Sequence, residues 1–311
     1  MNVCSLGIDT SNYTTSVAVS RGGRITEFRK KLLDVKEGER GLRQSEALFQ
    51  HVARLPELME GIGRDGAPGA VGVSTKPRDA EGSYMPCFLA GVSAASAVAS
   101  AVGAPLYGFS HQRGHVAAAL YSVGREDLLH GCFLAFHISG GTHELILYDG
   151  GKIDVVGRSL DISAGQLIDR VGVMTGLGFP CGAEMERLAD GRLPGVRPVI
   201  KGNDCNLSGF ENTVSSMLGK GVPAGEAYAF VFSAVLETVS AMIKNALSEA
   251  GDVPVLLAGG VSSNKTISGE LARRFGVMCA EPRFSSDNAA GIARLTELCL
   301  IGELDIKPMR S

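Results

Sequence analysis

The sequence predicts an α/β protein built from two related lobes, and three observations support this fold class. Short apolar segments typical of buried strands alternate with longer amphipathic segments of helical period. A stretch near the N-terminus recurs, without a gap, at a shift of 128 residues. Later in the chain, a strand-like segment ends in Gly259-Gly260 and runs into a helical segment.

The internal repeat aligns residues 6–25 with residues 134–153. Six of the twenty aligned positions are identical: Leu6/Leu134, Ser11/Ser139, Thr14/Thr142, Gly22/Gly150, Gly23/Gly151 and Ile25/Ile153. Each copy reads as a strand, a turn rich in hydroxyls or glycine, and a second strand, and such turns offer N–H groups to phosphate. Two unrelated hairpins of equal length are the alternative. Two facing copies would form a nucleotide cleft, which is the plan of the actin-like ATPase (ASKHA) fold.

The remaining elements follow from periodicity and from turn residues. We expect strands at 3–8, 14–19, 24–33, 70–74 and 253–258, and helices at 44–62, 89–102, 164–176, 227–250 and 289–300. Ser262 and Ser263 are placed to cap the helix after the 253–258 strand. No linker marks a boundary, so the repeat sets the lobes at 1–130 plus 287–311, and at 131–286.

Composition narrows the function classes. With 311 residues, 45% apolar and 20% charged, the chain is an ordinary globular protein with room for two cores. Seven cysteines without a Cys-x-x-Cys pair indicate free thiols. The N-terminal segment lacks signal-peptide features, and we found no apolar run suited to a membrane span. We therefore expect a cytoplasmic protein without a membrane partner.

The charge balance bears on nucleic-acid partners. A net charge of −3 gives no global attraction to RNA. An RNA partner would need a local basic patch or a helper protein. Residues 21–31 form the densest basic cluster, for which a solvated face is the alternative interpretation.

Two histidines four residues apart, His111 and His115, predict a metal site. On a helix they share one face and can present two imidazoles to one ion. Two surface histidines are the alternative. In zinc proteases of the His-Glu-x-x-His type, the Glu is the general base. Gln112 stands at that position here, and an amide cannot take a proton from water.

Seven segments, in order and spanning nearly the whole chain, resemble the tRNA threonylcarbamoyladenosine synthase family (TsaD), formerly described as O-sialoglycoprotein endopeptidases. They are His111–His115, Ser139–Gly141, Asp161–Asp169, Gly176–Gly182, Leu207–Gly209, Gly259–Asn264 and Asp287–Ala290. No single segment is specific, whereas seven in the right order are. The family has the actin-like fold, so the resemblance and the repeat agree.

The resemblance implies ligands and roles for particular residues. His111, His115 and Asp287 would bind one divalent metal, iron or zinc, with positions left open for substrate. ATP or an adenylate would contact the turn after His137, namely Ser139, Gly140 and Gly141, and would lie against Gly259 and Gly260. Asp169 would bind a ribose hydroxyl, and Gly182 and Asn264 would flank the ribose and adenine. A plain hairpin turn, a surface carboxylate, a turn glycine and a helix cap are the alternatives for these positions.

The chain also departs from the family pattern at positions expected near the chemistry. Asn12-Tyr13-Thr14 replaces Cys-Asp-Glu, Thr142-His143 inverts His-Thr, Ile162 and Gln166 replace acidic residues, and the 76–84 loop lacks a Gly-Pro-Gly run. These changes predict a less acidic cleft. With fewer carboxylates to act as general base, His143 or His137 would take that catalytic role near neutral pH.

The resemblance implies transfer of a threonylcarbamoyl group from its adenylate to N6 of adenosine 37 of tRNA, with tRNA and proteins of that pathway as partners. We expect this reaction or that of a divergent paralogue. Two alternatives are carbamoyl-adenylate transfer to a small molecule and a nucleotide-binding scaffold without catalysis. A protease is the least favoured interpretation, because no Ser-His-Asp or Cys-His set emerges from the sequence.

Overall fold

The computed structural model describes residues 3–11, 13–35, 42–285 and 288–309. The chain divides into two compact units, and each is described by itself. Unit 1 consists of residues Met1–Glu126 and Ser286–Ser311, and unit 2 of Asp127–Ser285. The boundaries drawn from the repeat, at 130/131 and 286/287, differ from these divisions by a few residues.

Unit 1 contains a five-stranded sheet in the order β3-β2-β1-β4-β5. Its strands are β1 (Cys4–Ser11), β2 (Thr14–Arg21), β3 (Arg24–Leu32), β4 (Ala70–Lys76) and β5 (Leu106–Ser110). The first three are antiparallel neighbours, and β4 and β5 run parallel to β1. Every residue of β1 is buried, because helices cover both faces of the sheet.

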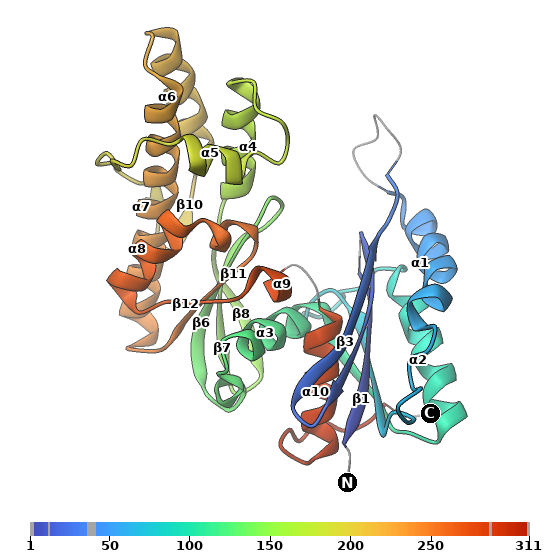
Figure 1. Cartoon of the computed structure of the whole chain (residues 1–311). Helices are drawn as coiled ribbons and strands as arrows, with labels where there is room; N and C mark the ends of the chain where they lie inside the picture. Colours follow the sequence, from blue (N-terminus) through green and yellow to red (C-terminus); the bar gives the residue numbers. More distant parts are fainter. Residues whose placement is uncertain (1–2, 12, 36–41, 286–287, 310–311) are drawn as a thin grey trace. The chain divides into compact units, whose positions relative to one another are not determined.

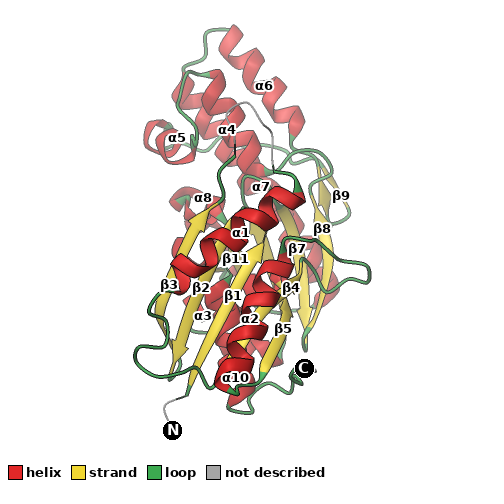
Figure 2. Ribbon diagram, turned by 90° about the vertical axis from the view of Figure 1, so that its right-hand side faces the viewer, coloured by secondary structure: helices red, strands yellow, loops and turns green. Residues whose placement is uncertain are grey.

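The helices of unit 1 form one layer on each side of this sheet (Figure 1, Figure 2). One layer contains α1 (Gln44–Met59) and α2 (Phe88–Val102), and the other α3 (His111–Ser122) and α10 (Ala289–Leu300). Helix α10 packs against β1, β2 and β4, and α3 packs against α10. The first helical residues of α3 are therefore held next to the start of α10.

Unit 2 repeats this sheet. Its strands are β6 (Cys132–Ile138), β7 (His143–Asp149), β8 (Lys152–Arg158), β11 (Val255–Ala258) and β12 (Met278–Cys279), in the order β12-β11-β6-β7-β8. Leu6 pairs with Val19 in unit 1, and Leu134 pairs with Leu147 in unit 2, so the first hairpin keeps the same register at the shift of 128. This shared order and register confirm the duplication.

Between β8 and β11, unit 2 carries a helical insertion. It contains α4 (Ala164–Met174), α5 (Gly182–Leu188), the short strands β9 (Ile200–Lys201) and β10 (Asp204–Cys205), α6 (Ser208–Gly219) and α7 (Ala224–Ala250). The sequence pattern did not predict α5, α6 or the β9–β10 pair. After β11, the chain forms η2 (Gly260–Ser263), α8 (Lys265–Phe275) and α9 (Pro282–Ser285). A short 3₁₀ helix, η1 (Glu126–His130), precedes β6.

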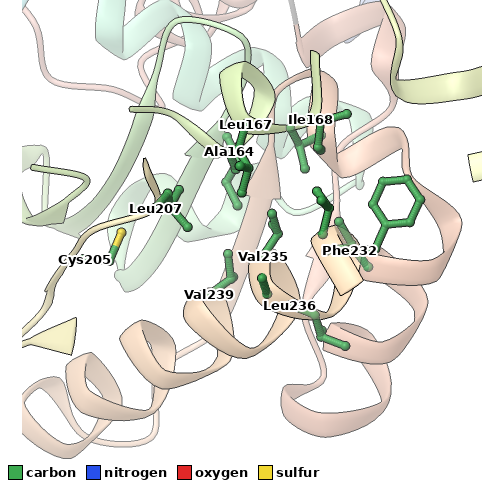
Figure 3. Close-up of a cluster of buried hydrophobic side chains, with 14 of the residues drawn as sticks. Ala164, Leu167, Ile168, Cys205, Leu207, Phe232, Val235, Leu236 and Val239 are labelled. Carbon is green, nitrogen blue, oxygen red and sulfur yellow. The ribbon is translucent and has the colours of Figure 1, made fainter. Parts of the chain in front are cut away.

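The core of unit 2 lies where α4 packs on α7. Leu167 of α4 and Phe232 of α7 are buried in one cluster with Leu236 and Leu207 (Figure 3). By length and composition α7 would suffice to cross a membrane, but 78% of its most apolar window is buried inside the protein. Its apolar surface therefore serves the core of unit 2.

Candidate functional site

A pocket with a volume of about 400 Å³ lies within unit 2. Five residues that the sequence analysis assigned to nucleotide binding line it: Gly140, Asp169, Gly182, Gly260 and Asn264. The other lining residues are Gly165, Ile168, Phe179, Pro180, Ala183, Glu186, Val261 and Ser263. The fold therefore gathers motif residues that are far apart in the chain.

The turn between β6 and β7 forms one wall of this pocket. The N–H of Ser139 donates to the carbonyl of Thr142 at 2.8 Å, and the N–H of Thr142 donates to Ser139 Oγ at 3.0 Å. The Oγ of Ser163, the residue before α4, donates to the carbonyl of Gly140 at 2.7 Å. Gly140 lines the pocket, whereas Ser139 shapes the turn and does not line it. Gly141, also predicted to bind, is absent from the lining as well.

Helix α4 begins directly against this turn because its second residue is glycine. A Cβ on Gly165 would lie 2.5 Å from the carbonyl oxygen of Ser139 and 2.7 Å from the nitrogen of Gly140. Both neighbours are backbone atoms, so a larger residue would push the turn and the helix apart. Close packing here places Gly140 and Asp169, which lies one turn further along α4, at the same pocket.

Asp169 connects α4 to the loop that precedes α5. Its Oδ1 accepts a hydrogen bond of 2.8 Å from the backbone N–H of Cys181, whose side chain is buried. This contact fixes the loop that carries Phe179 and Pro180 at the edge of the pocket. The Phe179 side chain is 78% exposed. Phe179 was not among the predicted site residues, although it stands inside the Gly176–Gly182 motif.

The turn after β11 also contributes to the pocket, through Gly260 and the residues that follow it, whereas Gly259, predicted to contact the nucleotide, does not line it. Gly259 has φ of +102°, and a Cβ there would lie 2.2 Å from the carbonyl oxygen of Ile138, so only glycine fits. Asn264 caps α8, because its Oδ1 accepts the N–H of Ile267 at 2.8 Å. The expectation that Ser262 or Ser263 caps this helix is wrong. The Oγ of Ser262 instead donates to the carbonyl of Gly259.

The lining combines apolar and hydrogen-bonding groups. Ile168, Phe179 and Val261 give apolar surface, while Asp169 and Glu186 give two carboxylates. Glu186 also accepts a hydrogen bond from the N–H of Thr266 at 3.2 Å, which ties α5 to α8. A pocket of this kind suits a ligand with a flat apolar body and hydroxyl or amine donors.

The two histidines predicted as bases occupy different environments. His143 is 4% exposed, its ring packs edge-on against Phe136 at 5.0 Å, and neither ring nitrogen has a partner among the described residues. Burial lowers the pKa of His143 to about 4. His137 is half-buried at the end of β6, beside the turn that carries Gly140. The catalytic roles of both residues stay predictions.

The paired histidines of the predicted metal site begin α3, whose N-cap is Ser110. The ring centroids of His111 and His115 lie 4.6 Å apart, and the two ring planes meet at an angle of 72°. Nδ1 of His111 is engaged by the buried carboxylate of Asp9, at 3.2 Å, and by the amide of Asn288. Nε2 is then the nitrogen that His111 would offer to a metal, and the two-imidazole site stays a prediction.

The third predicted ligand, Asp287, lies outside the described residues. Among the residues that the structure describes, no group of three His, Cys, Asp or Glu side chains is arranged to hold a metal. Burial disfavours the charged form of Asp9, but the charge and hydrogen bond of His111, with the hydroxyl of Ser11, hold its pKa below the usual value. An ionised Asp9 keeps the His111 ring oriented.

Two departures from the family pattern have roles in folding. Ile162 is buried in the core of unit 2. Gln166 closes a capping box with Ser163, since its N–H donates to Ser163 Oγ while its Oε1 accepts the N–H of Ser163. A lost acid in the cleft was the expectation at both positions; it stays a prediction, and the structure adds a local role for each residue. Asn12, another departure, lies outside the described residues.

Asp161 connects two of the family-like motifs, Asp161–Asp169 and Leu207–Gly209. It accepts hydrogen bonds from the N–H of Leu207 at 2.8 Å, and from the N–H and Oγ of Ser208 at 3.0 and 2.6 Å. Although burial opposes ionisation, these bonds hold the pKa of Asp161 well below its usual value. Asp161 therefore anchors the start of α6 and does not line the pocket.

Solved structures with a similar fold share little sequence with this chain. HypF from T. kodakarensis is 13% identical, with a TM-score of 0.61, over 97% of this chain and 48% of that one. Component A of the (R)-2-hydroxyglutaryl-CoA dehydratase of Acidaminococcus fermentans is 18% identical, with a TM-score of 0.55. The match covers 96% of this chain and 99% of that one. A Streptomyces griseus ROK glucokinase solved with glucose and AMPPNP is 14% identical, with a TM-score of 0.51. The match covers 95% of this chain and 98% of that one. The fold is thus the actin-like ATPase fold.

Residues 70–294 match the family described as TsaD, tRNA N6-adenosine threonylcarbamoyltransferase. The match covers more than two thirds of the chain, and it includes both histidines of α3 and the whole lining of the pocket. The chain therefore belongs to the tRNA N6-adenosine threonylcarbamoyltransferase family.

Proposed function

We propose that the protein transfers a threonylcarbamoyl group from its adenylate to N6 of an adenosine in tRNA. The observation that carries this proposal is that one pocket gathers Gly140, Asp169, Gly182, Gly260 and Asn264, the motif residues assigned to the adenylate. Membership in the family supports the reaction class.

The pocket residues suggest how the adenylate would bind. The carboxylate of Asp169 would accept a ribose hydroxyl, while Ile168 and Val261 would cover the adenine faces. The turn at Gly140 would face the phosphate, since backbone N–H groups of such turns bind anions. These contacts would orient the adenylate and keep water from its acyl carbon.

In the reaction, the N6 nitrogen would attack the carbamoyl carbon, the bond from that carbon to the phosphate oxygen would break, and AMP would leave with the electron pair. The amine proton needs an acceptor. Of the two predicted bases, His137 suits this step better because it is half-buried, whereas His143 is enclosed and has a pKa near 4.

The metal of this family would be held by His111 and His115, with Asp287 proposed as the third ligand. When bound, a divalent ion supplies Lewis-acid polarisation of a substrate oxygen. Asp9, whose carboxylate lies 3.2 Å from Nδ1 of His111, would orient that ring for the metal. Iron or zinc suits two imidazoles and a carboxylate.

A small-molecule acceptor is the second candidate. The net charge of −3 favours it, because a chain without overall positive charge has no long-range attraction for tRNA. If tRNA is the acceptor, proteins of the same pathway would help to recruit it. The cytoplasm suits either reaction, since all seven cysteines are free thiols.

The test is incubation of purified protein with threonylcarbamoyl-adenylate, a divalent metal and unmodified tRNA, followed by mass spectrometry of the digested nucleosides. We expect modified adenosine and AMP in equal amounts, and loss of both in Asp169→Ala. The matched control is Asp190→Ala, which removes an exposed carboxylate of unit 2 outside the pocket. AMP release that does not depend on tRNA would favour the small-molecule acceptor. No AMP release with any acceptor would overturn the proposal.

A further inference from the structure

Unit 2 contains a second pocket next to the one described above. Its volume is about 710 Å³, and it shares Gly140, Asp169 and Phe179 with the first pocket. Its other lining residues are Gln166, Arg170, Val173, Met174 and Glu211. The exposed side of α4 forms most of its wall, and Glu211 of α6 and Phe179 of the loop before α5 complete it.

Large apolar side chains are exposed in this second pocket. Phe179 is 78% exposed, Val173 is 55% exposed and Met174 is 41% exposed. All three line the same pocket although they come from the last turn of α4 and from the following loop. Exposed apolar side chains that gather in a hollow mark a binding surface more often than isolated ones do.

Polar groups surround this apolar surface. Arg170 and Glu211 form an ion pair at 3.1 Å that links α4 to α6. The Oε1 of Gln166 is committed to the N–H of Ser163, so the amide N–H groups are what Gln166 can offer to a ligand. The Oδ1 of Asp169 holds Cys181, which leaves Oδ2 as its second acceptor. The pocket therefore offers both donors and acceptors around a flat apolar surface.

We propose that this second pocket binds the purine base of the acceptor adenosine, stacked on the ring of Phe179. An adenine has a flat π face for an aromatic side chain, an exocyclic amine for a carboxylate, and ring nitrogens that accept from an amide. Phe179, Glu211 and Gln166 match these three features. The volume is within the range of small-ligand sites.

The residues that line both pockets would place the two substrates of the reaction side by side. Gly140, at the turn proposed to face the adenylate phosphate, lines both pockets. A base in the second pocket would thus lie next to the group that it must attack. The role of this site rests on the proposed function, while the binding of adenosine there does not. In this arrangement Val173 and Phe179 are specificity-determining residues for the acceptor.

The experiment detects base binding directly. Protein labelled with ¹³C at its methionine methyl groups is saturated with AMPPNP, and adenosine is then titrated. Met174 lines only the second pocket, and the core residue Met242 is the internal control. We expect a saturable shift of the Met174 signal without a shift of Met242. In Val173→Arg, the long charged side chain would occupy the space next to Phe179, so the adenosine affinity should fall at least about tenfold.

The matched control is Val199→Arg, which places the same charge on a comparably exposed valine of unit 2 outside both pockets. Equal adenosine binding by the two variants, or no Met174 shift up to the solubility limit of adenosine, overturns the inference. Competition between AMPPNP and adenosine for the Met174 shift also overturns it, because one ligand would then fill both pockets.

RNA hairpins identify the source of the base. We expect a hairpin with adenosine in its loop to shift Met174, and the same hairpin without that base to leave the signal unchanged. Equal shifts from both hairpins would show that the pocket does not read a base. Should the proposed transfer reaction fail while adenosine still shifts Met174, the binding site stands and the proposed function falls.

Discussion

The backbone N–H of Cys181 donates a 2.8 Å hydrogen bond to Oδ1 of Asp169, and this contact joins the loop 176–181 to helix α4. Asp169 lines both pockets of unit 2, and the loop carries Phe179, which also lines both. One carboxylate therefore holds the loop with one oxygen and presents the other to a ligand.

Replacing Asp169 should separate these two roles. We expect Asp169→Ala to weaken binding of an adenine nucleotide by about 1–3 kcal/mol, the range for a lost charge-assisted hydrogen bond. Asp169→Asn keeps an oxygen for the Cys181 N–H but loses the charge. Its nucleotide affinity should therefore lie between those of the wild type and Asp169→Ala. Calorimetry measures both, with Asp190→Ala as the control. Unchanged affinity in Asp169→Ala would remove this residue from the site.

A methyl group on Gly165 should disrupt the pocket wall. The Cβ would meet backbone atoms of Ser139 and Gly140 at 2.5–2.7 Å, so the turn must move. We expect Gly165→Ala to cost about 1–3 kcal/mol of stability through overpacking and to weaken nucleotide binding. The control is Gly209→Ala in the first turn of α6, where a Cβ meets nothing within 4 Å. Thermal denaturation that ranks the two variants as equal would contradict this account.

Metal content should depend on the histidines of α3. We expect elemental analysis to find about one divalent ion per chain, and each of His111→Ala, His115→Ala and Asp287→Ala to lower the occupancy sharply, because two remaining ligands hold an ion weakly. His130→Ala changes an exposed histidine and should leave occupancy unchanged. Full occupancy in the double histidine variant would rule out this site.

His143 should make stability depend on pH. Burial lowers its pKa to about 4, below the ordinary value of 6.5, so the folded state favours the neutral ring. The resulting stability is fully present above pH 6.5 and is lost as pH falls toward 4, by roughly 3 kcal/mol at most. We expect His143→Phe, which keeps the ring volume, to flatten the unfolding free energy over this range. An unchanged pH profile would show that the ring is not enclosed in solution.

The same variant tests the catalytic prediction for His143. If His143 is the base, His143→Phe should abolish transfer while leaving the fold and nucleotide affinity intact. If His137 is the base, as its half-buried position favours, His137→Gln should lose activity and His143→Phe should retain it. Rapid transfer in both variants would exclude both histidines.

The sequence alone was enough to predict the duplicated hairpin, because a hairpin pairs neighbours along the chain. The repeat at 128 residues carries through to the register, where Leu6 pairs with Val19 and Leu134 with Leu147. The i, i+4 spacing likewise placed His111 and His115 on one helix face. The motif resemblance identified the family and five residues of the first pocket.

Packing between distant segments decided the rest. The sequence marked His143 as a base, but only the folded sheet encloses its ring and lowers its pKa. Gln166 was expected as the replacement of an acid, and only the structure shows that its side chain completes a helix cap. The second pocket exists because α6 brings Glu211 to α4 and because Asp169 holds the Phe179 loop beside both. Spacing along a chain fixes local pairs, whereas burial and shared pockets depend on contacts between residues that the sequence keeps far apart.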